Sequence, residues 1–457
     1  MKRITIDPIT RLEGHGKIEI FLNDEGDVDN VYFQVPELRG FEKFCEGRAV
    51  EELSQIVTKI CGVCPGCHHM AAGKATDAVF GVKPPPTARK LRELFYMAHF
   101  IHSHIAHFFA LAAPDFVVGP TADPAERNVL GVIGKVGKEI GTEVLKQRRI
   151  AQEIQALLGG HQTHVVMNVP GGVRKALKPE ERDQIVKQAE GFIEFSKFSL
   201  KLFEDVVLGN DEYVDIILNG PYKLNIYSMG LVDENNKVNF YNGKVRVVDT
   251  LGKEHCKYSP EDYREWVAER VEPWSYLKFP YLKKVGWNGF SEGQDSGVYH
   301  ATPLSRLNVA DGMATPLAQI EYEKMYKTLG GKPVHNTLAM HWARLIELLY
   351  SAEHSLELAQ DSDITGTELR AQLGNIHGEG VGIVEAQRGT LTHHYWTDKK
   401  GIVEKINIIV GTTNNNAPIC MSLKKAAQAL INKNVDVDQG ILNMIEMAFR
   451  AYDPCFS

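Results

Sequence analysis

The sequence of 457 residues lacks any apolar run that could cross a membrane, because its longest apolar stretches, such as 101–113, are too short and too rich in histidine. It also lacks a basic run: acidic and basic residues are mixed and the net charge is −7, which argues against a nucleic-acid partner. No low-complexity linker and no internal repeat divides the chain. We therefore expect one large, intertwined domain over residues 1–457, with no direct membrane span.

Patterns for binding organic cofactors are equally scarce. No Gly-x-Gly-x-x-Gly segment follows a predicted strand, and Gly131, Gly134 and Gly137 lie within a helical pattern instead. The seven cysteines form only one cluster, at residues 61–67, so no second cluster could hold an iron–sulfur relay. An odd count with such a cluster indicates metal or redox chemistry rather than a disulfide framework. Nicotinamide, flavin and iron–sulfur centres, if used, are expected on other subunits.

The hydrophobic pattern predicts an α+β fold that is mainly helical. The first long helix is expected to begin with Thr87 as its N-cap and to end at Pro114. Period-two and β-branched segments predict strands at 3–7, 16–22, 30–35 and 402–410, with further short strands within 213–250. Helical spacing predicts helices at 87–113, 125–157, 179–208, 334–360, 421–432 and 437–450.

The strongest local signal is the segment Cys61-Gly62-Val63-Cys64-Pro65-Gly66-Cys67-His68. A Cys-x-x-Cys turn presents two thiolates to one metal, and thiolates favour soft or borderline metals. Zinc sites use the same turn, but they usually need a second cysteine or histidine pair nearby. A thioredoxin-like redox site would need a surrounding βαβ pattern, which is missing. Taken alone, the motif leaves these interpretations open. A further possibility is that the two cysteines are simply buried and have no metal or redox role.

Six ordered stretches between residues 7 and 455 together resemble the motifs of nickel–iron hydrogenase large subunits. The cysteine segment resembles the first cysteine motif of that family, with Lys59 in place of arginine. The other five are Asp7-Pro8-Ile9-Thr10-Arg11-Leu12-Glu13-Gly14-His15, Arg39-Gly40-Phe41-Glu42, Glu385-Ala386-Gln387-Arg388-Gly389-Thr390-Leu391 with Gln387 in place of proline, Gly411-Thr412-Thr413-Asn414-Asn415, and Asp453-Pro454-Cys455. The resemblance implies the family's large-subunit fold, with a central bundle of long helices and peripheral β-structure.

The same resemblance implies a binuclear metal centre. Nickel would be held by four thiolates, two of them shared with an iron that carries CO and cyanide. Cys61 and Cys455 would be terminal nickel ligands, and Cys64 would be a bridge. Thr412 would hydrogen-bond an iron-bound cyanide, and His68 would donate to a bridging sulfur. Four cysteines match no ligand position and are interpreted as small buried residues: Cys45, Cys67, Cys256 and Cys420.

Proton and cation roles follow from the resemblance as well. Heterolytic cleavage of H2 needs a Lewis-acidic metal and a base for the proton. Because arginine stays protonated in proteins, we expect a thiolate such as Cys64 to be the base and Arg388 to orient charge above the metals. Glu13 would be the first carrier that takes the proton away. Glu42, with a backbone carbonyl near Ile408, would hold a separate magnesium-type ion.

The predicted helix 87–113 also carries His99, His102, His104 and His107. Their spacing could hold zinc, but the resemblance places a similar His-Ser-His segment beside the active site. Ser103 and the segment 450–455 resemble the corresponding residues of the cytoplasmic multimeric branch of the family. This implies a cytoplasmic protein with an obligate iron–sulfur small subunit. Electrons from H2 would pass on, through diaphorase or other electron-transfer subunits, to NAD(P), ferredoxin or a similar acceptor.

Two alternatives remain. The first is a catalytically silent relative that has lost its metal, like the quinone-reductase-type subunits that share this fold; the second is a zinc-binding globular protein. The sequence ends at Ser457, where the family would continue with the second bridging cysteine and, three positions later, a histidine of the magnesium-type site. We expect the native chain to extend past Ser457. Metal analysis separates the three interpretations as nickel plus iron, no metal, or zinc.

Overall fold

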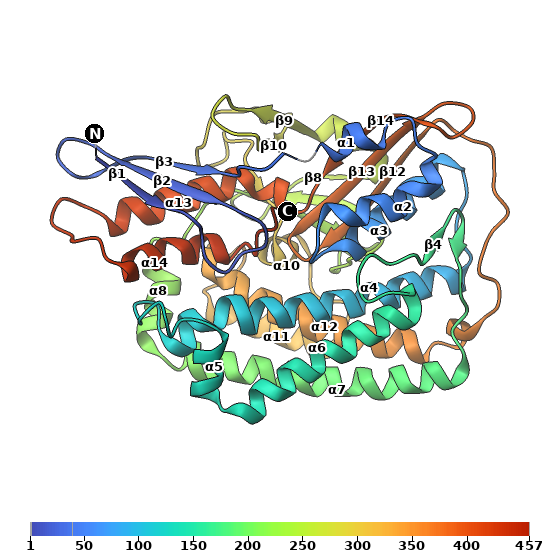
Figure 1. The fold of residues 1–457 in the computed structure, drawn as a ribbon, viewed down its shortest axis with the longest axis horizontal. Helices are drawn as coiled ribbons and strands as arrows, with labels where there is room; N and C mark the ends of the chain where they lie inside the picture. Colours follow the sequence, from blue (N-terminus) through green and yellow to red (C-terminus); the bar gives the residue numbers. More distant parts are fainter. Residues whose placement is uncertain (1, 39, 457) are drawn as a thin grey trace.

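Four long helices form the centre of the computed structural model, which describes residues 2–38 and 40–456 (Figure 1). Helix α12 packs against α7 and α4, and α6 packs against both α4 and α7. Nearly all of α12 is buried, so it is apolar around most of its circumference, as expected for a helix surrounded by others. The four helices are α4 (Pro86–Ala106), α6 (Lys138–Gly159), α7 (Pro179–Phe203) and α12 (Met340–Gln360).

A three-stranded antiparallel sheet lies against helix α3 (Pro65–Val79), which follows the cysteine turn. Its strands are β12 (Glu379–Ala386), β13 (Gly389–Thr397) and β14 (Val403–Ile409). Strand β12 approaches α3 so closely that a Cβ added to Gly382 would lie 2.1 Å from the carbonyl oxygen of Ala71. Glycine is therefore required there, and this contact brings the β12–β13 hairpin next to the start of α3.

The remaining strands form peripheral sheets, which confirms the predicted class. Strands β1 (Lys2–Ile6), β2 (Lys17–Leu22) and β3 (Val28–Gln34) form an antiparallel sheet, and α13 packs against β3. A four-stranded sheet has the order β11-β6-β7-β8, with β11 (Tyr299–His300), β6 (Tyr227–Val232), β7 (Lys244–Val248) and β8 (Glu254–Tyr258). Two pairs complete the set: β4 (Asn168–Val169) with β5 (Gly172–Val173), and β9 (Val267–Val271) with β10 (Lys278–Leu282).

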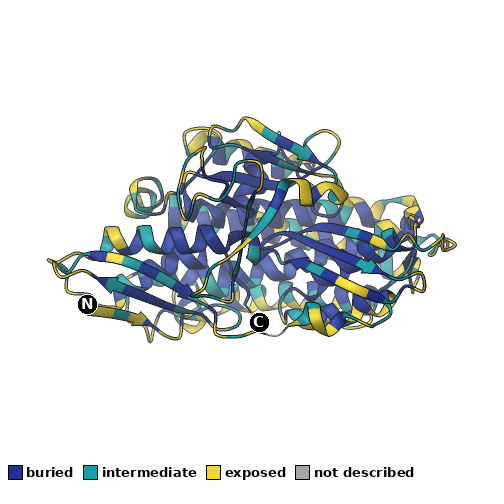
Figure 2. Cartoon of the chain, turned by 90° about the horizontal axis from the view of Figure 1, so that it is seen from above, coloured by how far each residue is buried: buried dark blue, intermediate teal, exposed yellow. Residues whose placement is uncertain are grey.

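Shorter helices connect these layers. They are α1 (Phe41–Cys45), α2 (Leu53–Ile56), α5 (Val129–Val136), α8 (Asp211–Asn219), α9 (Tyr263–Trp266), α10 (Pro303–Val309), α11 (Pro316–Thr328), α13 (Asn416–Leu430) and α14 (Gln439–Arg450). Buried residues dominate α4, α12 and the inner faces of the sheets, whereas only part of α6 and α7 is buried, and exposed residues lie at the periphery (Figure 2). No described helix has the length and apolarity that a bilayer crossing requires.

Several predicted boundaries were wrong. The expected helix 125–157 is divided into α5 and α6, because Gly137 adopts a φ of 96° between them. Helix α4 begins at Pro86, after Pro85 at the N-cap, so Thr87 is not the cap; its hydroxyl donates to the carbonyl of Asp363. The helical path also continues past Pro114 as π-helical turns, because proline at the first position of such a turn needs no N–H partner.

The start of the segment 213–250 was also misassigned. Residues 213–219 belong to helix α8, since the side chain of Asn210 accepts hydrogen bonds from the backbone of Glu212 and Tyr213 and caps the helix. Residues 334–339 precede α12 rather than belonging to it. Helices α3, α10 and α11 were not predicted at all. Among the motif residues, Arg39 lies outside the described part of the chain, as does Ser457.

Candidate metal centre

The two ends of the chain bring three cysteines together. Cys61 and Cys64 lie in the turn before α3, where Cys64 is the N-cap residue, and Cys455 follows α14. All three are buried, their sulfur atoms lie within 4.8 Å of one another, and the sulfurs of Cys61 and Cys455 are 2.7 Å apart. Within residues 2–38 and 40–456, this is the one group of three or more cysteine, histidine or carboxylate side chains that could hold a metal ion.

Backbone contacts fix the position of Cys455. Residues 13 and 455 form a parallel β-bridge, and the backbone N–H of Phe456 donates to the carbonyl of Glu13 at 3.1 Å. The backbone N–H of Cys455 donates to the hydroxyl oxygen of Thr412 at 3.2 Å. Glu13, Thr412 and Cys455, which belong to three motifs far apart in the sequence, therefore meet at one place. Thr412 accepts with its oxygen here, and its predicted bond to a cyanide stays a prediction.

Arg388 lies at the tip of the β12–β13 hairpin and is buried beside the cysteines. Its guanidinium group is 3.0 Å from a carboxylate oxygen of Asp453 and donates to the hydroxyl of Ser103 at 3.2 Å. Burial by itself would lower the pKa of Arg388, but Asp453 and the cysteine sulfurs hold that pKa above its ordinary value. The group therefore stays a cation, which agrees with the orienting role predicted for it.

The three cysteine thiols differ in pKa. Burial raises the pKa of Cys61, but hydrogen bonds from Cys455 and Cys64 and the charge of Arg388 bring this pKa well below its ordinary value. Hydrogen bonds with Cys455 and Cys61 raise the pKa of Cys64, and the hydrogen bond with Cys61, together with burial, raises the pKa of Cys455. Cys61 is therefore the thiol most readily ionised, and a metal ion that bound all three sulfurs would displace the protons of the other two.

Glu13 lies between the sulfurs and the surface. The thiol of Cys455 donates to Oε2 of Glu13 at 3.0 Å, and the Glu13 side chain is only half-buried. A Cβ added to Gly62, next to Cys61, would be 3.9 Å from the other carboxylate oxygen. A carboxylate in this place can take a proton from sulfur and pass it outward.

His68 is completely buried in α3, one turn beyond Cys64. Its Nδ1 is 3.0 Å from Nε2 of His393, whose Nδ1 is 2.6 Å from the hydroxyl of Tyr395. Burial lowers the pKa of His68 to about 4, so the ring is neutral. Its Nε2 has no partner among the described residues. The predicted bond from this nitrogen to a bridging sulfur stays a prediction.

Glu42 in α1 lies beside Ile408, whose backbone N–H donates to Oε1 of Glu42 at 2.8 Å. The other oxygen lies 3.7 Å from Nζ of Lys278, and the Glu42 side chain is 38% exposed. The predicted magnesium-type site, with Glu42 and a backbone carbonyl near Ile408 as ligands, stays a prediction.

The other cysteines and the histidines of α4 serve packing and local hydrogen bonds. Cys45, Cys67, Cys256 and Cys420 are all buried, and burial raises their pKa values to between about 11 and about 12. The histidines of the α4 region form hydrogen bonds with different partners: His99 with Gln155, His104 with Glu347 and His107 with the carbonyl of Arg450. They do not converge on one point, so the zinc interpretation of this helix gains no support.

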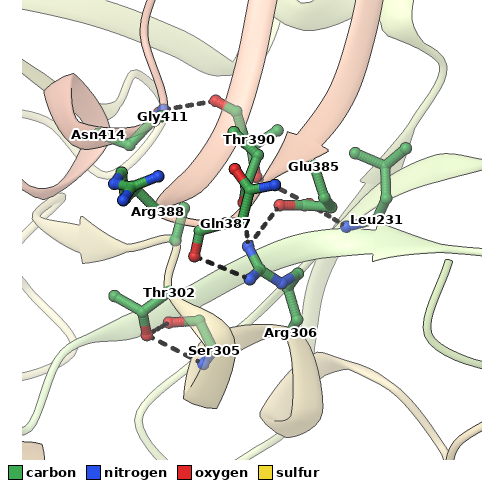
Figure 3. Close-up of polar contacts among 12 residues, drawn as sticks. Leu231, Thr302, Ser305, Arg306, Glu385, Gln387, Arg388, Thr390, Gly411 and Asn414 are labelled. Atoms are coloured by element: carbon green, nitrogen blue, oxygen red, sulfur yellow. Dashed lines mark hydrogen bonds and ion pairs between the residues drawn. The ribbon is translucent and has the colours of Figure 1, made fainter. Parts of the chain in front are cut away.

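One buried charge cluster was not predicted. The guanidinium of Arg306 binds both carboxylate oxygens of Glu347, at 2.6 and 2.8 Å, and one oxygen of Glu385 at 3.1 Å. It also donates to the carbonyls of Ala386 and Gln387 at 2.8 and 3.2 Å, and so holds the hairpin tip (Figure 3). No local pattern marks these residues, which come from three distant segments. Asp453 was missed as well, although its Asp-Pro-Cys motif was recognised.

Comparison with known proteins agrees with this geometry. The family model for nickel-dependent hydrogenase matches residues 39–130 and 142–457, and a HoxL-like model matches 3–38. An iron-sulfur subunit of the F420-non-reducing hydrogenase from Archaeoglobus profundus is 48% identical over 455 residues, which cover 100% of this chain and 93% of that protein. The NAD-reducing hydrogenase HoxS subunit beta of Cupriavidus necator is 36% identical, covering 100% and 94%.

A solved structure is similar throughout. An NAD+-reducing NiFe hydrogenase in the H2-reduced state superimposes with a TM-score of 0.94 at 37% identity, covering 100% of this chain and 98% of that one. The predicted fold is therefore confirmed, and both motif-bearing ends of the chain fall within the matched regions. This chain belongs to the nickel-dependent hydrogenase family and is a large subunit of the nickel–iron type.

Proposed function

We propose that this chain is the catalytic subunit of a hydrogenase that splits H2 heterolytically and reversibly into protons and electrons. The observation that carries the proposal is the meeting of three buried thiols with a half-buried carboxylate and a buried guanidinium. Each group supplies a property that the reaction needs: soft ligands, a proton acceptor with access to water, and a fixed positive charge.

The residues fit a nickel–iron pair. Cys61, Cys64 and Cys455 offer thiolates, which favour such metals over magnesium or calcium. Among the buried nitrogen atoms that lack partners in the described residues, three belong to predicted motifs: Nε2 of His68, Nε2 of Gln387 and Nε of Arg388. Buried donors rarely stay unpaired, so their presence around the thiols supports a bound group with acceptor atoms. When bound, the nickel–iron pair, with CO and cyanide on iron, supplies the Lewis-acidic and redox chemistry.

The protein's own groups then handle the proton and the charge. A thiolate receives the proton, and the 3.0 Å contact from Cys455 to Glu13 favours Cys455 over Cys64 for the transfer outward. Arg388 stays charged, so it orients H2 and stabilises negative charge rather than acting as the base. Asp453 holds the Arg388 side chain in position through their ion pair. His68 would donate to a metal-binding sulfur, and Thr412 would donate to a cyanide of the bound group.

Electrons leave through partner subunits in this proposal. The chain would pair with an iron–sulfur small subunit, through an interface above roughly 2,000 Å². Leu38 and Phe44 support such an interface, because they are 72% and 54% exposed and lie next to the motif that contains Glu42. Diaphorase or other electron-transfer subunits would then reduce NAD(P), ferredoxin or a similar acceptor in the cytoplasm. Two relatives are named as F420-non-reducing and NAD-reducing hydrogenase subunits, so the acceptor differs among similar chains.

A magnesium-type ion near Glu42 remains part of the proposal. Glu42 lies against the backbone of Ile408. Its carboxylate and a backbone carbonyl near Ile408 would offer the oxygen ligands that hard cations require. Lys278 would have to move away from Glu42 on binding, because a cation and an ammonium group repel each other.

The test is the activity and metal content of the complex of this chain with its small subunit. We expect one nickel per complex, iron beyond that of the iron–sulfur clusters of the small subunit, and H2-dependent reduction of an artificial dye. A catalytically silent relative is the second candidate. It would assemble with its partners, contain no nickel and reduce no dye.

A further inference from the structure

Gln387 is held at both ends beside the cysteines. It is the first turn residue of the β12–β13 hairpin, directly before Arg388, and it is completely buried. Its backbone carbonyl accepts from Nη2 of Arg306 at 3.2 Å (Figure 3). The thiol of Cys67 donates to its side-chain oxygen at 3.1 Å. The side chain is therefore positioned by specific contacts and does not merely fill space.

The NH2 end of the Gln387 amide has no partner among the described residues. A thiol donates through its hydrogen, so the oxygen faces Cys67 and both amide hydrogens point elsewhere. A buried donor that has lost water and found no acceptor is destabilising, and such groups are rare in folded proteins. The geometry thus indicates an acceptor that is not part of the described chain.

The Gln387 side chain lies next to residues of the candidate metal centre. The backbone N–H of Cys67 donates to the carbonyl of Cys64 at 3.1 Å, which places Cys67 within one turn of a metal-binding thiol. Arg388, the next residue after Gln387, pairs with Asp453, two residues before Cys455. Gln387 is therefore linked to the residues around the three sulfurs in two ways. Its side chain accepts a hydrogen bond from Cys67, and its chain neighbour Arg388 pairs with Asp453.

Among the groups of a nickel–iron centre, cyanide is the acceptor that suits an amide best. Its terminal nitrogen carries negative charge and accepts hydrogen bonds strongly, whereas the oxygen of CO accepts weakly. The described sulfurs already have contacts: Cys61 with Cys455, and Cys455 with Glu13.

We propose that Nε2 of Gln387 donates a hydrogen bond to a cyanide ligand of the iron and that Gln387 is a positioning residue of this centre. The proposal rests on the function proposed above. The family motif has proline at this position, and proline offers no side-chain donor. The hydrogen bond is therefore a feature that this chain adds to the family's centre, and it would change the electron density at iron.

Infrared spectroscopy of the complex with the small subunit tests this directly, since each cyanide ligand gives its own stretching band. The variant Gln387→Leu removes the amide donor but keeps a side chain of similar size. The variant Gln387→Pro introduces the residue that the family has at this position. We expect a shift of one cyanide band in both variants, with nickel and iron content unchanged. The matched control is Gln147→Leu, which removes a buried glutamine of α6 that donates to Glu143; its bands should equal those of the unaltered complex.

A second pair of variants probes the orientation of the amide. Cys67→Ala removes the donor that holds the oxygen, so the same cyanide band should shift or broaden, and Cys67→Ser should restore it. Identical cyanide bands in the unaltered complex and in every Gln387 variant that contains metal would overturn the role of Gln387. If Gln387→Leu fails to assemble, Gln387→Pro alone decides. An unaltered complex with no cyanide bands would instead refute the proposed function.

Discussion

Replacement of Glu13 by glutamine is the perturbation that isolates proton transfer from metal binding. Glutamine keeps the size of the side chain and one hydrogen-bonding oxygen, but it cannot take up a proton at neutral pH. Because Oε2 lies 3.0 Å from the sulfur of Cys455, a proton can pass from the Cys455 thiol to Glu13 in a single step. General acid–base groups contribute about 10²–10⁴-fold to a rate. Glu13 is half-buried, so water can replace part of its function, and we expect a loss of at least about tenfold.

The assay measures H/D exchange between H2 and water together with H2-dependent dye reduction. Both rates should fall in Glu13→Gln, while nickel and iron remain bound because Glu13 is not a ligand. Glu51→Gln is the matched control, since Glu51 is an exposed glutamate of the loop between α1 and α2. Exchange at the unaltered rate in Glu13→Gln would refute this proton path and move the exit to another group.

Three further predictions follow from buried groups. Changing any one of the three metal-binding cysteines to serine should abolish activity and nickel binding, whereas Cys256→Ser should keep most of both, as elemental analysis would show. Arg306→Met leaves buried carboxylates without their cation and should lower stability by about 3–5 kcal/mol, seen as a lower melting temperature. Burial lowers the pKa of His354, but Glu357 and Glu93 raise it to about 9, above the unfolded value of about 6.5. This stabilisation is complete below pH of about 6.5 and is lost as pH rises through about 9, so His354→Gln should flatten the fall in melting temperature over that range.

The sequence predicted the meeting of the three cysteines better than it predicted the helix boundaries. Cys61, Cys64 and Cys455 stand in short motifs whose spacing is typical of metal ligands, so the motifs can be recognised without any knowledge of the fold. The break at Gly137 could have been read from the glycine itself, and the cap at Asn210 from the following Asp211 and Glu212.

The positioning of the hairpin tip could not be predicted in this way. Arg306, Glu347 and Glu385 meet only because α10, α12 and β12 pack together, and a salt bridge between distant segments leaves no periodic signal. The same holds for the contact of Cys67 with Gln387, which joins residues 320 positions apart. Both arise from tertiary packing around the metal site, so they become visible only in the folded chain.

X-ray absorption at the nickel edge of the purified complex tests the central claim most directly. The account predicts nickel surrounded by sulfur ligands with iron as a neighbour, and loss of the nickel signal in Cys61→Ser, Cys64→Ser or Cys455→Ser. Nickel bound mainly by nitrogen and oxygen, zinc in its place, or no metal in a correctly assembled complex would contradict it.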